Sequence, residues 1–335
     1  MEKEISDLLK TEYIEKATKQ WDGHENVTLI DDVENFVYDF VCEGKRRILR
    51  LTHSTHRSED DIEAELDWIN FLYDNDVKVS KPVPSKNMRF TEVTPVDDSY
   101  FVACVFERAP GNFVDTSNPH EWNTNLFRDW GKTIGKMHAL TKKYYPKHLR
   151  KKRHEWYEDD VIINSSKYVP PHESQILKDL ELTLGRIRTL PKTPDSYALV
   201  HNDLNPTNFF VDNGDITVFD FDDSCYNWFI CDIATSIPLY SPIFLNADWK
   251  DATKEFFYHF LTGYNEENKI DVFWFEYLPT FLRLLNICSV IFSYKIDEKN
   301  RTLYNGFFEK VLNIYKNGHN LYRFNFHAMY ESLGT

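Results

Sequence analysis

The stretch Leu199–Ala234, LVHNDLNPTNFFVDNGDITVFDFDDSCYNWFICDIA, decides the fold that we predict for this chain. Near its start, His201, Asp203 and Asn208 stand in the spacing His-x-Asp-x4-Asn. In loops with this spacing the Asp faces a substrate hydroxyl and the Asn binds a metal ion. A single Asp or Asn would indicate only a surface turn. The prediction therefore depends on the spacing and on the segment that follows it.

A predicted β-hairpin follows this loop. Phe209–Val211 and Ile216–Phe219 are two apolar runs, and Asn213-Gly214 lies between them. Asn-Gly is favoured in tight hairpin turns because both central residues need positive φ. The return strand ends at Asp220, so we expect this carboxylate to lie close to the loop that the chain has just left.

These residue types suit phosphoryl transfer. The transferred group carries heavy negative charge, so the protein supplies mainly positioning and cations. Magnesium prefers oxygen ligands, which the Asn208 carbonyl and the Asp220 carboxylate can provide. A further carboxylate must orient and deprotonate the attacking hydroxyl. We therefore predict Asn208 and Asp220 as Mg²⁺ ligands and Asp203 as the general base or hydroxyl-orienting group.

The segments HNDLNPTN and VFDFDD resemble the catalytic loop and metal motif of the aminoglycoside phosphotransferase and choline kinase superfamily. The resemblance continues through SCYNWFICDIA, where Asp232 matches the Asp that braces the catalytic loop together with His201. His201-Asn202-Asp203 is closer to the choline kinase form than to the His-Gly-Asp of most antibiotic kinases. The run is also similar to bacterial stress-response kinases and homoserine-kinase-like enzymes.

The resemblance implies an α+β fold of the two-lobed, protein-kinase-like type that binds ATP and magnesium. A small antiparallel sheet would form an ATP-covering lobe over residues 1–108, and residues 109–335 would form a mainly helical catalytic and substrate-binding lobe. VFERAPG resembles the hinge between such lobes, where backbone groups of Glu107 and Ala109 would meet the adenine edge. Pro110-Gly111 is a sound boundary.

The N-terminal region reads as an amphipathic helix followed by strands. We predict the helix over Met1–Trp21 and strands over Val27–Ile30, Asn35–Cys42, Arg47–Thr52, Met88–Val93 and Tyr100–Phe106. No G-x-G-x-x-G loop is present, so phosphate cover would depend on backbone amides between Asp31 and Phe36.

Arg50 on the third strand is the expected contact for the α- and β-phosphates, since arginine suits bidentate phosphate binding. A helix predicted over Ser58–Asn75, capped by Ser58, supplies its partner. Glu65 is the candidate, with Glu63 as the fallback.

The remaining chain reads as mainly helical. In the predicted helix Trp122–Leu140, Gly131 and Gly135 allow close backbone packing, and His138 reads as a satisfied core histidine. Lys147–Arg153 is a basic run that reads as a solvated loop. Further helices are predicted over Gln175–Leu190, Lys254–Tyr264 and Asp271–Tyr294, and the last of three segments ends near Asn317.

The composition of the chain argues against several classes of protein. The 335 residues carry a formal net charge of −14, which argues against general nucleic-acid binding. No apolar segment is long enough to span a bilayer, so no membrane partner is expected. The five cysteines are scattered and odd in number, which disfavours disulfides and zinc. We expect a cytoplasmic protein; the sequence does not decide its oligomeric state.

The acceptor is predicted to be small, hydroxylated and cationic or zwitterionic, such as an amino alcohol, amino acid or aminoglycoside-like molecule. Asp222 and Asp223 follow the metal ligand and are candidates for contacting substrate or a second metal, although a structural role for Asp222 is an equal alternative. The chain is also acidic overall and rich in aromatic residues near its end, and both features attract ammonium groups.

Three alternatives stay open. A Ser/Thr protein kinase of the stress-response type would need an open groove, which sequence does not reveal. A nucleotide-binding pseudokinase would need none of Asp203, Asn208 and Asp220, yet all three are present. A metal-dependent phosphohydrolase would need His- and Asp-rich clusters that the sequence lacks.

Overall fold

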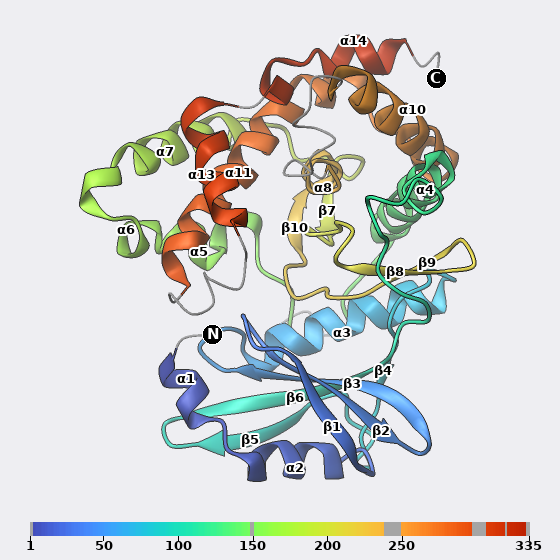
Figure 1. Cartoon of the computed structure of the whole chain (residues 1–335), viewed down its shortest axis with the longest axis vertical. Coiled ribbons are helices and arrows are strands. Elements are labelled where there is room, and N and C mark those ends of the chain that lie inside the picture. Colours follow the sequence, from blue (N-terminus) through green and yellow to red (C-terminus); the bar gives the residue numbers. More distant parts are fainter. Residues whose placement is uncertain (1–2, 148–150, 238–248, 297–305, 319, 333–335) are drawn as a thin grey trace. The chain divides into compact units, whose positions relative to one another are not determined.

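The computed structural model describes residues 3–147, 151–237, 249–296, 306–318 and 320–332. It divides into two compact units (Figure 1). The first unit contains residues 1–110, 144–153 and 217–222; the second contains residues 111–143, 154–216 and 223–335. Two segments from later in the sequence therefore pack with the N-terminal residues.

The first unit is built on an antiparallel sheet with the strand order β1-β2-β3-β6-β4, and β5 pairs with β6. The strands are β1 (Gly23–Asp31), β2 (Phe36–Cys42), β3 (Lys45–His53), β4 (Pro82–Val83), β5 (Glu92–Val96) and β6 (Ser99–Glu107). Glu43 and Gly44 join β2 to β3 with positive φ values of 50° and 71°. This left-handed turn connects adjacent antiparallel strands with two residues.

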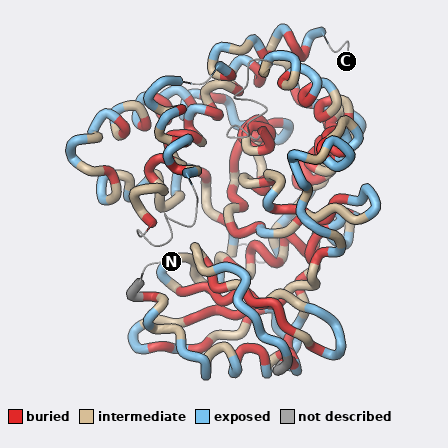
Figure 2. Tube along the Cα trace, viewed as in Figure 1, coloured by how far each residue is buried: buried red, intermediate tan, exposed pale blue. Residues whose placement is uncertain are grey.

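Side chains alternate across this sheet, as the pleat requires. On β3, Leu49 and Leu51 are 0% and 2% exposed and belong to an apolar cluster that also contains Trp21 and Phe40. Arg50, which lies between them, therefore points to the opposite face. Figure 2 shows how much of the sheet is buried.

Helices cover both faces of the sheet. Helix α3 (Glu59–Asp74) lies on the face that carries Arg50, and α2 (Thr11–Lys19) lies on the other (Figure 1). The prediction of one helix over residues 1–21 is wrong, because α1 (Lys3–Leu8) is separate from α2. Lys10 is extended, with φ −97° and ψ 151°. The break lets both helices add side chains to the same apolar cluster.

The fourth predicted strand is displaced. Residues 88–93 do not form it; instead β5 begins at Glu92, after a turn in which the Ser85 amide donates to the Arg89 carbonyl at 2.7 Å. Met88 has a φ of 59° and is 80% exposed. Pro95 is tolerated in β5 because this strand pairs on one side only.

The second unit contains a close pair of helices, α4 (Thr124–Thr141) and α10 (Trp249–Glu267). A Cβ atom added at Gly131 would lie 1.8 Å from the Phe260 carbonyl oxygen, and one added at Gly135 would lie 2.6 Å from that of Tyr264. Glycine is thus required at both positions, and the predicted close backbone packing is confirmed.

Other elements of this unit are further helices, 3₁₀ turns and small sheets, and the last two residues of one of these sheets, Thr217 and Val218, belong to the first unit. The helices are α5 (Asp160–Ile163), α6 (Ser165–Tyr168), α7 (Gln175–Ile187), α8 (Phe229–Thr235), α11 (Leu278–Lys295), α13 (Phe307–Asn317) and α14 (Phe326–Glu331). The 3₁₀ turns are η1 (Trp156–Glu158), η2 (Pro171–Glu173), η3 (Val272–Glu276) and η4 (Asn320–Arg323). The helix predicted from Asp271 is divided into η3 and α11, because Pro279 favours the first turn of a helix. Part of the last predicted segment, residues 297–305, lies outside the described residues.

The small sheets flank the predicted catalytic loop, residues 201–208, which runs from β7 to β8. Strand β7 (Tyr197–Val200) pairs with β10 (Cys225–Trp228), and β8 (Phe209–Asp212) pairs with β9 (Asp215–Val218). Asn213 and Gly214 have φ values of 51° and 91°, which confirms the predicted turn of the β8–β9 hairpin.

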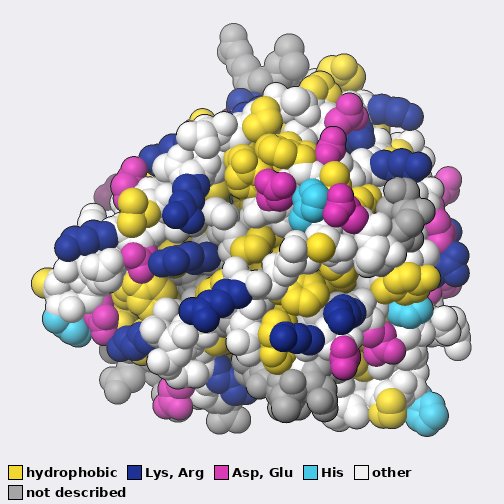
Figure 3. Space-filling view, turned by 90° about the horizontal axis from the view of Figure 1, so that it is seen from above, with side chains coloured by type: hydrophobic (Ala, Val, Ile, Leu, Met, Phe, Trp, Pro, Cys, Tyr) yellow, Lys and Arg dark blue, Asp and Glu magenta, His cyan; other side chains and the backbone are white. Residues whose placement is uncertain are grey.

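None of the described helices is long and apolar enough to cross a membrane. On the face shown in Figure 3, lysine and arginine side chains are scattered among aspartate and glutamate side chains. The net negative charge therefore does not make this face uniformly acidic.

Candidate active site

The loop after β7 holds the predicted base. The Asn208 side-chain amide donates to the Asp203 carboxylate at 2.6 Å and to the Asp203 carbonyl at 2.8 Å. Asn205 donates to the other carboxylate oxygen at 2.9 Å. Because the Asn208 nitrogen is used in this way, its side-chain oxygen remains as the group that can meet a cation, which is the role predicted for it.

The same loop is braced by Asp232 from α8. The Asn202 backbone N–H donates to the Asp232 carboxylate at 2.6 Å, and the Asp203 N–H donates to Nδ1 of the buried His201 at 3.3 Å. Asn202 has a φ of 68°, so the chain turns through the left-handed region between His201 and Asp203. The bracing contacts expected of His201 and Asp232 are thus present.

A buried polar chain continues from Asp232. Its second oxygen is 2.9 Å from Nε2 of His138, whose Nδ1 is 2.9 Å from the Tyr264 hydroxyl. Asn268 donates to that hydroxyl at 2.8 Å, and Lys142 donates to Asn268 at 2.7 Å. One tautomer of His138, with the proton on Nε2, satisfies every bond in the chain. His138 is therefore a satisfied core histidine, as predicted.

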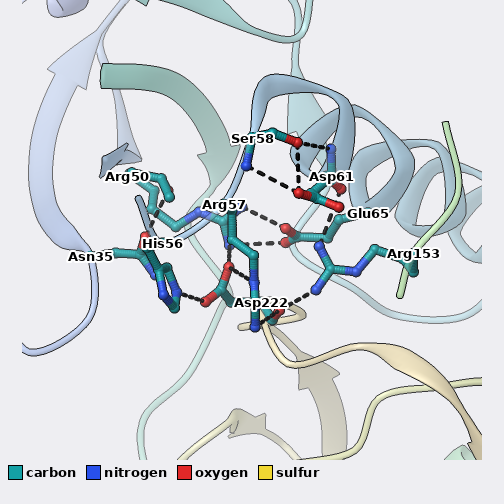
Figure 4. Close-up of polar contacts among 10 residues, drawn as sticks. Asn35, Arg50, His56, Arg57, Ser58, Asp61, Glu65, Arg153 and Asp222 are labelled. Carbon is teal, nitrogen blue, oxygen red and sulfur yellow. Dashed lines mark hydrogen bonds and ion pairs between the residues drawn. The ribbon is translucent and has the colours of Figure 1, made fainter. Parts of the chain in front are cut away.

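In the first unit, Arg50 makes two parallel hydrogen bonds to Glu65, at 2.9 and 2.7 Å (Figure 4). This is the partner expected from the sequence, and both side chains are buried. The fallback Glu63 contacts Lys151 and Thr91 instead. Burial alone would lower the pKa of Arg50, but Glu65 and the nearby Asp222 outweigh it, and the pKa lies well above its ordinary value.

Asp222 is enclosed by basic side chains (Figure 4). Its Oδ2 is 2.6 Å from Nε2 of His56, and its Oδ1 is 3.9 Å from Arg50 and 3.8 Å from Arg57. Burial would raise the pKa of this carboxyl, but His56, Arg57 and Arg50 hold it well below its usual range. His56 and Arg57 carry no motif and precede the N-cap Ser58, so sequence reasoning missed them.

Asp220 is in a different environment. Burial, and then the charge of Asp222, raise its pKa to about 7. Its φ of 61° is sparsely populated by residues other than glycine. The next residue, Phe221, packs edge-on against Trp68 of α3 at 5.4 Å, which fixes this turn. A buried carboxylate beside a second negative charge is one that a bound cation would stabilise.

The donor set fits magnesium better than zinc. Among the described residues no group of three or more His, Cys, Asp or Glu could hold a metal. Magnesium is usually held by one or two carboxylates and phosphate oxygens rather than by an all-protein cage. The Asn208 amide oxygen, in the second unit, and the Asp220 carboxylate, in the first, are each a ligand of that kind.

The predicted site residues fall into two described groups. Arg50, Glu65, Glu107, Ala109, Asp220 and Asp222 belong to the first unit, and His201, Asp203, Asn208, Asp223 and Asp232 to the second. The Glu107 N–H donates to the Lys81 carbonyl at 2.8 Å. Of the two Glu107 backbone groups, only the carbonyl is therefore left for an adenine edge.

One error concerns the basic run 147–153. Residues 148–150 lie outside the described part of the chain, but Arg153 is 1% exposed and is not in a solvated loop. Lys151 pairs with Asp60 at 3.0 Å and with Glu63. The two carboxylates that pair with Lys151 lie on α3, far away in sequence, so the local charge pattern did not reveal this packing.

Comparison with known proteins defines the class. Residues 27–268 match the model of the phosphotransferase enzyme family, and the chain belongs to that family. It is a phosphotransferase with an alcohol group as acceptor, and its fold is the protein-kinase-like α+β fold predicted from the sequence.

Individual relatives show which phosphotransferases this chain is similar to. The chain is 38% identical over 289 residues to amicoumacin kinase of Bacillus subtilis (strain 168), covering 84% of each chain. A solved structure of an amicoumacin kinase in complex with AMP-PNP, Ca²⁺ and Ami matches with a TM-score of 0.85 and 32% identity, covering 98% of this chain and 100% of that one. A microcompartment-associated aminopropanol kinase shares the fold, with a TM-score of 0.72 and 21% identity over 92% of this chain and 97% of that one.

Proposed function

We propose that this chain transfers the γ-phosphoryl group of ATP, with Mg²⁺, to a hydroxyl of a small cationic or zwitterionic molecule, with amicoumacin as the first candidate acceptor. The observation that carries the proposal is the 38% identity to amicoumacin kinase over 84% of both chains. The solved relative with AMP-PNP and Ca²⁺ supports a nucleotide and a divalent cation as ligands.

The chemistry follows from the residues described. The acceptor oxygen attacks the γ-phosphorus, the bond from that phosphorus to the bridging oxygen breaks, and ADP leaves. Asp203 orients the hydroxyl and takes its proton. Arg50, held by Glu65, contacts the phosphates. Magnesium, bound by Asn208 and Asp220, would neutralise charge on the phosphates.

The remaining assignments belong to the same proposal. Residues 1–108 cover ATP and residues 109–335 carry the acceptor, while backbone groups of Glu107 and Ala109 meet adenine. The contacts of Asp222 with His56 and arginines favour its structural alternative, which leaves Asp223 as the candidate for substrate contact. The five described cysteines are free thiols, which supports a cytoplasmic location.

The test is ATP consumption with magnesium and parallel acceptors: amicoumacin, choline, ethanolamine, homoserine, an aminoglycoside, a neutral sugar and a protein rich in serine. We expect turnover with a cationic or zwitterionic acceptor, most rapidly with amicoumacin, and a kcat lowered roughly 100- to 10,000-fold in Asp203→Asn. Preference for the neutral sugar would overturn the acceptor class, and preference for the protein would favour a Ser/Thr kinase. Nucleotide binding without transfer to any acceptor would favour a pseudokinase.

A further inference from the structure

Arg153 is a buried cation to which the proposed chemistry assigns no task. It ends the segment 144–153, which packs in the first unit although it follows α4 in sequence. Arg153 is 1% exposed, which places it among the most buried of the large side chains. A buried charge is costly unless it is paired or well hydrogen-bonded, so its contacts are informative.

Two backbone carbonyls receive hydrogen bonds from the Arg153 guanidinium (Figure 4). Nη1 donates to the Asp61 carbonyl at 3.2 Å, and Nη2 donates to the Asp222 carbonyl. Arg57 donates to the same Asp222 carbonyl at 3.3 Å. Asp61 lies in the first turn of α3, where its side chain forms a capping box with Ser58. One planar side chain thus joins the start of α3 to the turn that follows Asp220.

The charges around Arg153 do not favour its position. The pKa of Arg153 lies below its ordinary value, because burial and the neighbouring Arg57 both lower it. The carboxylates of Glu65, Asp222 and Asp61 raise this pKa, but by less. The hydrogen bonds from Arg153 to Asp61 and Asp222 both go to neutral backbone carbonyls. What a guanidinium adds over any other cation is its rigid fork, which fixes the direction of two acceptors at once.

We infer that Arg153 is a positioning residue that fixes the Asp220–Asp222 turn against α3. It thereby sets the direction of the predicted metal ligand Asp220. Through α3, which also carries Glu65, it ties that ligand to the Arg50–Glu65 pair. The inference rests on the proposed function, because it assigns Arg153 a task in the same reaction.

Two variants separate the geometry of Arg153 from its charge. Arg153→Ala removes both, and Arg153→Lys keeps a cation but not the fork. Outer residues that orient metal ligands typically contribute about 10- to 100-fold to metal affinity or activity. We expect both variants to lose magnesium-dependent ATP affinity in calorimetry by about this factor, while affinity for ATP without metal changes little. Added guanidinium, but not methylammonium, should restore part of the loss in Arg153→Ala.

A matched control removes a buried hydrogen bond elsewhere. Asn286, 1% exposed, donates to the Val311 carbonyl at 3.1 Å, and Asn286→Ala should lower Tm without altering magnesium-dependent affinity. Hydrogen exchange in Arg153→Lys should rise at residues 219–222 and in the first turn of α3. This measurement reports on the turn even if Arg153→Ala does not fold.

The outcomes distinguish the two proposals. Wild-type protein that binds ATP without any magnesium dependence overturns the proposed function and this inference together. Wild-type protein that shows the dependence, with Arg153→Lys equal to it in affinity and exchange, overturns only the inference. A lower Tm in the Arg153 variants together with unchanged magnesium-dependent ATP affinity, which is the result expected for Asn286→Ala, also overturns only the inference.

Discussion

The backbone at Asn202 accounts for a choice of residue in the catalytic loop. Its φ of 68° is left-handed, a region that glycine enters without cost and asparagine tolerates. The His-Gly-Asp and His-Asn-Asp forms of this loop therefore meet the same backbone requirement. Asn202 adds hydrogen bonds that glycine cannot make, because its side-chain oxygen accepts from the Asn227 amide at 3.0 Å and from the Cys231 thiol at 3.8 Å.

Substitution of Asn202 tests this explanation. Asn202→Gly loses the hydrogen bond from the Asn227 amide and the weaker one from the Cys231 thiol, and should cost about 1 kcal/mol of unfolding free energy. Asn202→Val should cost about 1–3 kcal/mol more, because a β-branched residue is strained at positive φ. Urea unfolding of both variants provides the measurement. Equal stability of the glycine and valine variants would contradict the role of φ.

Asp203 is expected to act through its charge and basicity. Asp203→Asn keeps the size of the side chain and should lower kcat roughly 100- to 10,000-fold with little change in Tm. Asp251→Asn, at a side chain that is 89% exposed, is the control and should leave kcat unchanged. Turnover of Asp203→Asn within about threefold of wild type, below the range for a general base, would reject Asp203 as catalytic.

Asp220 should be needed only when the metal is present. Asp220→Ala removes a charged oxygen from the predicted magnesium site, so ATP affinity should fall at least about tenfold with magnesium and hardly at all without it. Calorimetry under both conditions is the measurement. An equal loss with and without magnesium would mean that Asp220 contacts the nucleotide by another route.

At this scale the sequence revealed residues that belong to a motif or a regular element. Glu65 was predicted as the partner of Arg50 from the family resemblance, because its distance to the segment LYDNDVKVSKPVPS is similar to the family's pattern. Arg153, His56 and Arg57 were not predicted, since their contacts join segments that are far apart in sequence. A basic side chain beside other basic residues is usually solvated, and only tertiary packing reverses that expectation for Arg153.

Among the elements, α5 and α11 are linked by Asp160. Its carboxylate is 2.9 Å from Lys295 and accepts from Tyr168 and Asn164, each at 2.7 Å. Burial would raise the pKa of Asp160, but these three hydrogen bonds outweigh it and lower the pKa to about 2. A carboxyl whose pKa is lower in the folded state stabilises the fold above its unfolded pKa, and this contribution is lost as pH falls through the folded value.

Asp160→Asn should therefore be destabilised at neutral pH and should approach wild-type stability in acid. The difference in unfolding free energy should be constant above about pH 5 and decline as pH falls from 3.8 toward about 2. Denaturant unfolding at several pH values measures it, and Asp251→Asn is again the exposed control. A difference that stays constant down to pH 2 would show that packing, rather than charge, accounts for the loss.

Helices with a strong periodic pattern were predicted well. Element boundaries that depend on local turns or on tertiary packing were not. Helix α3 begins after Ser58, as its capping residues indicated, and α4 packs on its glycines. The strand expected at residues 88–93 is instead β5, Glu92–Val96, because local turn geometry at Met88 overrides apolar content. The separation of α1 from α2 likewise depends on a shared tertiary cluster, which no local pattern records.

At the scale of the molecule, the first unit is discontinuous in sequence. Besides residues 1–110 it needs 217–222, where the Ser80 N–H donates to the Val218 carbonyl at 2.8 Å and Phe221 packs against Trp68. It also needs Arg153 against α3.

We therefore expect a fragment of residues 1–110 to lack the cooperative unfolding of the whole chain. The fragment would expose apolar surface at Trp68 and leave buried polar groups without partners. Thermal unfolding followed by circular dichroism, with the full chain as control, measures this. A sharp transition in the fragment, near the Tm of the full chain, would contradict the expectation.

The discontinuity also bears on how the protein is made. A ribosome releases the sheet long before it releases the segment ending at Asp222, and the intervening 110 or so residues take on the order of 10 s at typical synthesis rates. During that interval the nascent chain contains the sheet and helix α3 but still lacks the segment 217–222 that packs with them. Protection of this intermediate, by a chaperone or by rapid translation across residues 111–222, would govern the yield of active protein.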